Sequence, residues 1–296
     1  MKAVVQQVEE GFRTAIALGN AYNGKLMLKV AKTVFNNREN GLEVTAFHFT
    51  VGSNVNPIYE EKFYEENFQP VLAEADRLNI PIHTEYGITD DLGPDVVRYV
   101  NKNKFDFLLI GGGLSLAEEP FFKEASLFKS IGWLNNLSNQ LLKGFRFFYP
   151  SILTKDKTDY FVKNSNCNVG IFLNRDFTAI TNTLVSIYSE QDDLFLFDYA
   201  YRLMNNNPSV TIDILDRNNV KASSDKFAKN INDLQQLFPN RVRVVKSDNG
   251  ASFYSRYSFM LISYPSWNKL IKADKQKPRV IPSTLIINKK QRISTR

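Results

Sequence analysis

The sequence predicts an α/β fold: two doubly wound, mainly parallel sheet domains in tandem, the second of them shortened. Two observations support this prediction. Short segments with strand character alternate with longer amphipathic segments along most of the chain, and the same alternation starts again near residue 181. A repeat of roughly 120–170 residues indicates two fused copies of one α/β unit rather than a solenoid. We therefore expect one domain at 1–175, a linker at 176–180 and a smaller second domain at 181–296.

The first unit is expected to alternate strand and helix. Its first strand is rich in Ala, Ile and Leu, and its second alternates apolar and polar residues. Its long second helix carries one apolar stripe, and its third helix has a proline near its first turn. The expected strands are 12–20, 42–50, 80–88, 105–112 and 165–174, and the expected helices are 24–37, 59–78 and 93–103. Helical structure is also expected around Trp133–Leu142.

The second unit repeats this order in a shorter form. Period-two alternation is clearest in its second strand, and Ser224 or Asp225 is expected to cap its second helix. The expected strands are 181–190, 209–216, 241–247, 258–264 and 282–290, and the expected helices are 192–208 and 223–239. The helix that would precede the fourth strand is reduced to the short segment 248–257.

The positive charge of the chain is concentrated at its C-terminal end. The net charge is +6, but residues 267–296 contain nine Lys and Arg against one Asp, a charge of +8, so the rest of the chain carries −2. A nucleic-acid-binding protein usually spreads its basic residues over a binding face, and we expect no nucleic-acid partner. The basic C-terminal tail predicts a solvated tail or a peripheral contact with anionic lipid headgroups.

Several features predict a cytoplasmic protein. The longest apolar runs, such as Val169–Leu173, are far too short to cross a bilayer, and the N-terminus lacks the long apolar core of a secretory signal. The single cysteine, Cys167, excludes an intramolecular disulfide and indicates a reducing compartment.

Specific stretches of the sequence resemble known proteins. "FDFLLIGGG", followed by a helix and then "SNCNVGIFLNRDF", resembles the end of a universal stress protein domain. Three stretches are similar to the cytosolic C-terminal region of monovalent cation:proton (Na+/H+ or K+/H+) antiporters of the CPA2 type: "GKLMLKVAKTVF" with the following "LEVTAFHFT", "NCNVGIFLNRDF", and "LVSIYSEQDDLFLFDYAYRLMNNNPSVTIDILD". In those proteins two stress-protein-like domains follow the membrane transporter. The similarity spans about residues 12–290.

This resemblance implies a regulatory and interaction module rather than an enzyme. The module would modulate transport through dimerisation or ligand-dependent domain packing, at the cytoplasmic face of the inner membrane if it is tethered to its transporter. Its implied partners are the membrane transporter domain of the antiporter and a second copy in a homodimer. The alternative is a stand-alone tandem universal stress protein that binds ATP, AMP or another nucleotide.

A ligand site of the stress-protein kind would lie at the C-terminal ends of the strands. In the nucleotide-binding family members, the resemblance implies a Gly-x-x-Gly turn, nine residues, and then Gly-Ser or Gly-Thr, whose backbone N–H groups approach phosphate. This chain departs from that pattern, because its three glycines are consecutive, the downstream Gly-Ser is missing, and Asn20 replaces the usual acidic residue. The candidate residues for a nucleotide or another anion are Gly19, Asn20, Gly111, Gly112, Gly113 and Ser115.

Two interpretations of this glycine run stay open. Gly111–Gly113 bind a nucleotide or a small anion, or they only permit a tight turn with positive φ. No resident cofactor is expected, although ATP or AMP fits the first interpretation. In the second unit Pro265 stands where the turn would need a glycine.

Other reactive residue types are expected to be structural. His48 and His83 sit within strands, and two histidines with one cysteine do not make a metal-ligand set. Asp192 and Asp193 precede a helix, where acids more often cap the helix than bind a metal. Cys167 lacks the basic surroundings of a reactive thiolate. No nucleophile elbow or acid–base pair is recognisable, which is why we expect no enzymatic activity.

Overall fold

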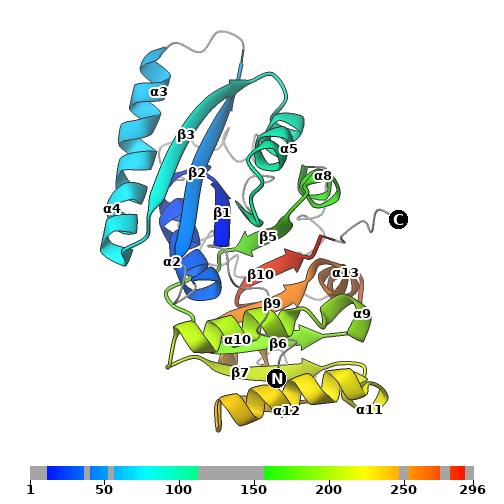
Figure 1. The fold of residues 1–296 in the computed structure, drawn as a ribbon. Helices are drawn as coiled ribbons and strands as arrows, with labels where there is room; N and C mark the ends of the chain where they lie inside the picture. The colour runs from blue at the N-terminus through cyan, green and yellow to red at the C-terminus, as the bar shows by residue number, and fades with distance from the viewer. Residues whose placement is uncertain are drawn as a thin grey trace, which may run out of the picture.

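The computed structural model describes residues 12–36, 41–52, 57–112, 157–246, 253–273 and 281–290. Within these ranges the strands form one continuous sheet in the order β3-β2-β1-β4-β5-β10-β9-β6-β7-β8 (Figure 1). Neighbouring strands are parallel, except that β5 and β10 are antiparallel. The strands are β1 Phe12–Ala17, β2 Leu42–Val51, β3 Ile82–Thr89, β4 Phe107–Gly111, β5 Asn168–Leu173, β6 Asn182–Ile187, β7 Thr211–Asp216, β8 Val242–Val245, β9 Phe259–Ser263 and β10 Ser283–Asn288. This sheet confirms the predicted α/β fold.

Helices cover both faces of the sheet, as expected of a doubly wound arrangement. One hydrophobic core lies under α2, α4, α10 and α12, and a second core lies on the opposite face under α5, α8 and α13 (Figure 1). The helices are α2 Ala21–Phe35, α3 Pro57–Phe63, a π-helix at Tyr64–Phe68, α4 Gln69–Leu78, α5 Leu92–Lys102, α8 Lys157–Asn164, α9 Glu190–Asp193, α10 Leu196–Asn206, α11 Val220–Ser223, α12 Asp225–Leu237, a 3₁₀ turn at Tyr254–Arg256 and α13 Tyr264–Ala273. Each core contains residues of both halves of the chain.

The two halves of the sheet are structural copies. Both have the strand order 3-2-1-4-5, and their registers match: Thr14 pairs with Phe107 as Thr183 pairs with Phe259. The antiparallel pair β5–β10, which we call the seam, joins the copies. At its centre Ile171 pairs with Ile286. Because equivalent strands meet there in opposite directions, the seam has the geometry of a twofold interface within one chain.

Most expected elements are found, with informative exceptions. Ser224 caps α12, since its Oγ accepts the N–H of Phe227 at 3.0 Å. The expected helix at 192–208 is divided into α9 and α10, and the one at 59–78 contains a π-helical turn. The sequence did not predict α8 or α13. The expected helix around Trp133–Leu142 lies outside the described residues, and residues 176–180 connect β5 to β6.

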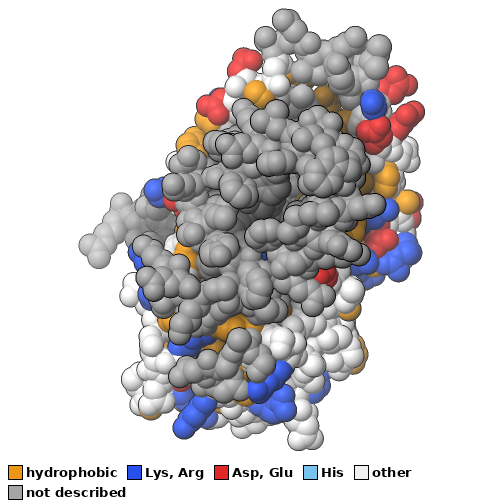
Figure 2. All heavy atoms as spheres, turned by 180° about the vertical axis from the view of Figure 1, so that it is seen from behind, with side chains coloured by type: hydrophobic (Ala, Val, Ile, Leu, Met, Phe, Trp, Pro, Cys, Tyr) orange, Lys and Arg blue, Asp and Glu red, His pale blue; other side chains and the backbone are white. Residues whose placement is uncertain are grey.

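The interpretation of residues 267–296 as a solvated tail is wrong for the part of that segment that the structure describes. Most of α13 and the whole of β10 belong to it, and β10 lies in the middle of the sheet. Trp267 and Leu285 illustrate the reason: each is at most 1% exposed, so apolar burial outweighs the flanking charge. From behind, Lys and Arg side chains are visible at the second-half end of the molecule and also along its sides (Figure 2).

A membrane span is not found in the described residues, because none of their helices combines the necessary length and hydropathy.

Candidate functional site

The described candidate residues meet at one edge of the first half. Ala17, the last residue of β1, pairs with Ile110 of the adjacent strand β4. Gly19 and Asn20 therefore follow β1 next to Gly111, the last residue of β4, and Gly112, whose N–H donates to the carbonyl of Phe172 at 2.8 Å. Gly113 and Ser115 lie outside the described residues. Four of the six predicted site residues thus lie at neighbouring C-terminal strand ends, where ligands of parallel sheets bind.

The N-terminus of α2 lies at this edge, and the chain's own amide side chains cap it. Asn20 is the N-cap residue, and its Oδ1 accepts the backbone N–H of Asn23 at 2.9 Å. Asn67, in the π-helix, accepts the N–H of Ala21 through its Oδ1, also at 2.9 Å. A phosphate at this helix end would compete with both amides for these N–H groups. The spacing of the sequence did not reveal the role of Asn67.

Gly111 does not need a glycine's conformational freedom. It ends β4 in ordinary strand geometry, and the described glycines with positive φ are Gly41 and Gly52. A Cβ at Gly111 would have Met27 Sδ as its nearest atom, at 4.0 Å. The interpretation that Gly111 permits a tight turn with positive φ is therefore wrong for this residue.

His48 lies beside the same edge, on the face that α3 and the π-helix cover. Its Nδ1–H donates to the carbonyl of Leu18 at 2.7 Å, and its ring stacks on Phe63 with 3.8 Å between centroids. Burial lowers the pKa of His48, and the hydrogen bond to Leu18 opposes this shift. The neutral ring therefore supports the β1 end from which Gly19 follows. This agrees with the expected structural role.

The corresponding edge of the second half is built differently. Ser189 takes the place of Asn20: it has extended backbone and caps α9 by accepting the N–H of Asp192. At the end of β9 the chain passes directly into α13 at Tyr264, and Pro265 lies in the first turn of that helix. A helix thus begins where the first half has its glycines.

A buried carboxylate closes this second edge. Asp193 is 0% exposed, and its Oδ2 accepts the N–H groups of Tyr188 at 2.7 Å and Ser189 at 3.0 Å. The hydroxyls of Ser263 and Ser266 donate to Oδ1, the latter at 2.8 Å. The sequence pattern identifies this aspartate only as a helix-terminal acid, because its partners in β9 and α13 lie 70 and 73 residues further along the chain.

The neighbouring Asp192 is also held by protein donors. It accepts from Ser189 Oγ at 2.8 Å and forms an ion pair with Lys269 at 2.7 Å. No group of three or more side chains suited to a metal ion occurs among the residues that the structure describes. Neither acid is the N-cap residue: Ser189 caps α9, and Asp192 and Asp193 lie within that helix. Asp192 and Asp193 instead connect the start of α9 to α13 through Lys269 and Ser266.

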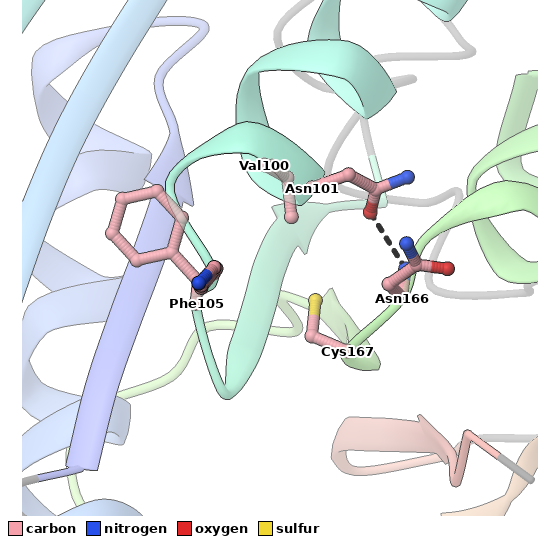
Figure 3. Close-up of a pocket in the computed structure, with 6 residues that line it drawn as sticks. Val100, Asn101, Phe105, Asn166 and Cys167 are labelled. Atoms are coloured by element: carbon pink, nitrogen blue, oxygen red, sulfur yellow. Dashed lines mark hydrogen bonds between the residues drawn. The ribbon is translucent and has the colours of Figure 1, made fainter. Parts of the chain in front are cut away.

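One cavity lies at the opposite end of β4, away from Gly111. It has a volume of about 320 Å³ and is lined by Val100, Asn101, Lys104, Phe105, Asn166 and Cys167 (Figure 3). Asn101 joins its two walls: its Oδ1 accepts the N–H of Asn166 at 2.7 Å, and its Nδ2 donates to the carbonyl of Asn164 at 3.1 Å. Burial raises the pKa of Cys167 to about 12, so its thiol is protonated at neutral pH.

Comparisons with known proteins show the fold. No family model matches the chain, and no curated protein matches its sequence. Among solved structures it is similar to a universal stress protein from Archaeoglobus fulgidus, with 12% identity, a TM-score of 0.51, and coverage of 93% of this chain and 95% of that one. It is also similar to a protein of unknown function from Pseudomonas aeruginosa PAO1, with 8% identity, a TM-score of 0.50, and coverage of 93% and 91%. The chain therefore has the fold of universal stress proteins, and function has to be argued from its sites.

Proposed function

We propose that this chain is the non-enzymatic regulatory module of a monovalent cation:proton antiporter, acting on the cytoplasmic side of the membrane. The observation that supports the proposal most is the position of two of the antiporter-like stretches, which we call the two motifs. The first, 166–177, contains β5, which forms one side of the seam. The second, 184–216, contains α10, which packs on α2 across the boundary between the halves. Both motifs hold the two halves in one arrangement.

Specific contacts make α10 the link between the halves. Asn206 Nδ2 donates to the carbonyl of Thr33 in α2 at 3.0 Å. The ring of Tyr199 meets Phe35 edge to face, with 6.0 Å between centroids. A change in the angle between the halves would have to break these contacts, so a second packing would be a discrete alternative and not a gradual bend.

The module would act by biasing the transporter between conformations. A partner or ligand shifts such an equilibrium only through different affinities for its states. The homodimer expected from the resemblance needs a surface other than the seam, because β5 and β10 already satisfy each other. Basic residues at the second-half end supply charge for contact with anionic lipids.

The full-length reading frame and a transport assay test this proposal. A run of apolar segments of about 20 residues ahead of Met1 would establish the transporter link. In vesicles, Asn206→Ala should change the rate or the pH dependence of cation-driven proton transport. Asn230→Ala is the matched control, since Asn230 makes a comparable bond within α12 only, to the carbonyl of Lys226 at 2.7 Å. A reading frame without spans, or a module deletion that leaves transport unchanged, would contradict the proposal.

The alternative is a stand-alone tandem universal stress protein that binds ATP or AMP. The gathering of Gly19, Asn20, Gly111 and Gly112 at adjacent strand ends favours it, whereas the amide caps on α2 oppose it. Mass spectrometry of the denatured purified protein, and thermal shifts with ATP and AMP, separate the two. Bound nucleotide or a saturable shift supports the alternative, and their absence rejects it.

A further inference from the structure

We propose that the strand-end site of the second half is an oxyanion site whose ligand is the protein's own Asp193 carboxylate. The inference does not depend on the antiporter. It rests on complete burial and on donors that come from segments far apart in the sequence. Tyr188 and Ser189 contribute N–H groups after β6, and Ser263 and Ser266 contribute hydroxyls at the junction of β9 and α13.

These donors are the kind that bind carboxylate or phosphate. Backbone N–H groups at a strand end and hydroxyls at a helix N-terminus both direct positive charge at an oxyanion. Ser266 lies in the first turn of the ten-residue helix α13, and its own N–H donates to Ser263 Oγ at 3.2 Å. Because Asp193 is 0% exposed, water cannot replace these donors.

Comparison of the halves shows that the carboxylate is particular to the second one. The N–H of Asp193 donates to the carbonyl of Ser189 at 3.2 Å, as the N–H of Gly24 donates to that of Asn20 at 3.0 Å. Gly24 is therefore the counterpart of Asp193. A Cβ at Gly24 would lie 2.5 Å from Leu18 Cδ2, so apolar packing fills the equivalent space in the first half.

A self-occupied site has a consequence for ligand binding. While the Asp193 carboxylate accepts these hydrogen bonds, the donors are not available to an external anion, and the negative charge of the carboxylate repels that anion. This strand-end position of the second half is then closed to phosphate. Removing the carboxylate without removing the donors should create a binding site for a small anion.

Chemical rescue of Asp193→Ala tests this inference. We expect its melting temperature to fall by more than about 5 °C in chloride, because two buried N–H groups lose their acceptor. Acetate or inorganic phosphate, at equal ionic strength, should restore several degrees in a saturable way. Asp192→Ala is the matched control: it removes one negative charge from the same helix but leaves the buried donors occupied. Asp193→Asn, which keeps an acceptor and fills the space, should show no anion response.

The outcomes separate clearly. Saturable rescue of Asp193→Ala alone supports the proposal. Equal anion effects on Asp193→Ala, Asp192→Ala and the wild type indicate general salt stabilisation and overturn it. If Asp193→Ala does not fold in chloride, its refolding yield in acetate against chloride gives the same comparison, and equal yields overturn the proposal.

Discussion

Ile171 of β5 and Ile286 of β10 pair at the centre of the seam. The residue pair on one side of this central pair is the counterpart of the pair on the other side, with the two strands interchanged. Gly170 pairs with Ile287, and Phe172 pairs with Leu285. The seam is therefore a self-complementary interface inside one chain. Each half alone would expose this apolar strand edge with its backbone groups unpaired. The two halves therefore depend on each other to complete the hydrogen bonding of the sheet.

Close packing at the seam makes Gly170 sensitive to substitution. A Cβ at Gly170 would lie 2.5 Å from the buried ring of Phe107 and 3.1 Å from Leu285 Cδ1. Gly170→Ala should lower the free energy of unfolding by about 1–3 kcal/mol, measured by urea denaturation. Gly111→Ala is the control: its Cβ would lie 4.0 Å from Met27 Sδ, the nearest atom of the described residues, and it should change the free energy of unfolding by less than about 0.5 kcal/mol. Equal effects of the two would contradict this account of the seam.

Two buried hydroxyls at equivalent positions should be dispensable. Thr14 and Thr183 are 0% exposed, and within the described residues their Oγ1 atoms have no hydrogen-bond partner. Replacing either with Val should raise the free energy of unfolding by about 0.5–1 kcal/mol, because an unpaired polar group leaves the core. Thr284→Val should lower it by about 1 kcal/mol, since Thr284 Oγ1 donates to the carbonyl of Pro282 at 2.7 Å. If Thr14→Val lowered the free energy of unfolding as much as Thr284→Val does, the Thr14 hydroxyl would have a hydrogen-bond partner.

His48 should make stability depend on pH. Burial lowers its folded pKa below 6.5, so the unfolded chain takes up a proton first as pH falls. The stabilising contribution is thus present above pH 6.5 and is lost on acidification, with a slope of at most about 1.4 kcal/mol per pH unit. Urea denaturation at pH 7.5 and 5.5 should show a smaller loss for His48→Leu than for the wild type. His83→Leu, at an exposed position, should behave like the wild type. An unchanged pH dependence in His48→Leu would assign it to other groups.

Cys167 should report on opening of the first half. It is the sole cysteine in the sequence, is 6% exposed, and has a pKa raised to about 12 by burial. At pH 8 a disulfide reagent should label the native protein at least about 100-fold more slowly than the urea-unfolded chain, because little thiolate forms in the folded state. Comparable rates would mean that the cavity admits both water and reagent to the thiol.

Asn20 should contribute to stability as a cap whether or not a ligand binds. Asn20→Ala should lower the free energy of unfolding by about 1 kcal/mol, since the N–H of Asn23 loses its acceptor. Asn20→Ser, which keeps a capping oxygen, should cost less than half of that. If both variants cost the same, the amide would be acting through a contact other than the cap.

The sequence alone determined the local elements of this protein. Strand alternation in 209–216, the helical stripe in 59–78 and the capping position Ser224 are set by residues close together in the chain, so their patterns are legible without the fold. The same local signals placed Gly19, Asn20 and Gly111 at C-terminal strand ends, where parallel sheets bind ligands, but they did not specify the order of the strands.

Only the tertiary structure decided how the halves join and what their edges contain. The seam depends on which apolar strand edge meets which, and no local pattern in β5 or β10 specifies a partner. Asp193 looks like an ordinary helix-terminal acid until β9 and α13 bring Ser263 and Ser266 to it. Long-range packing gives these residues their environment, and environment decides whether a carboxylate caps a helix, binds a metal or closes a site.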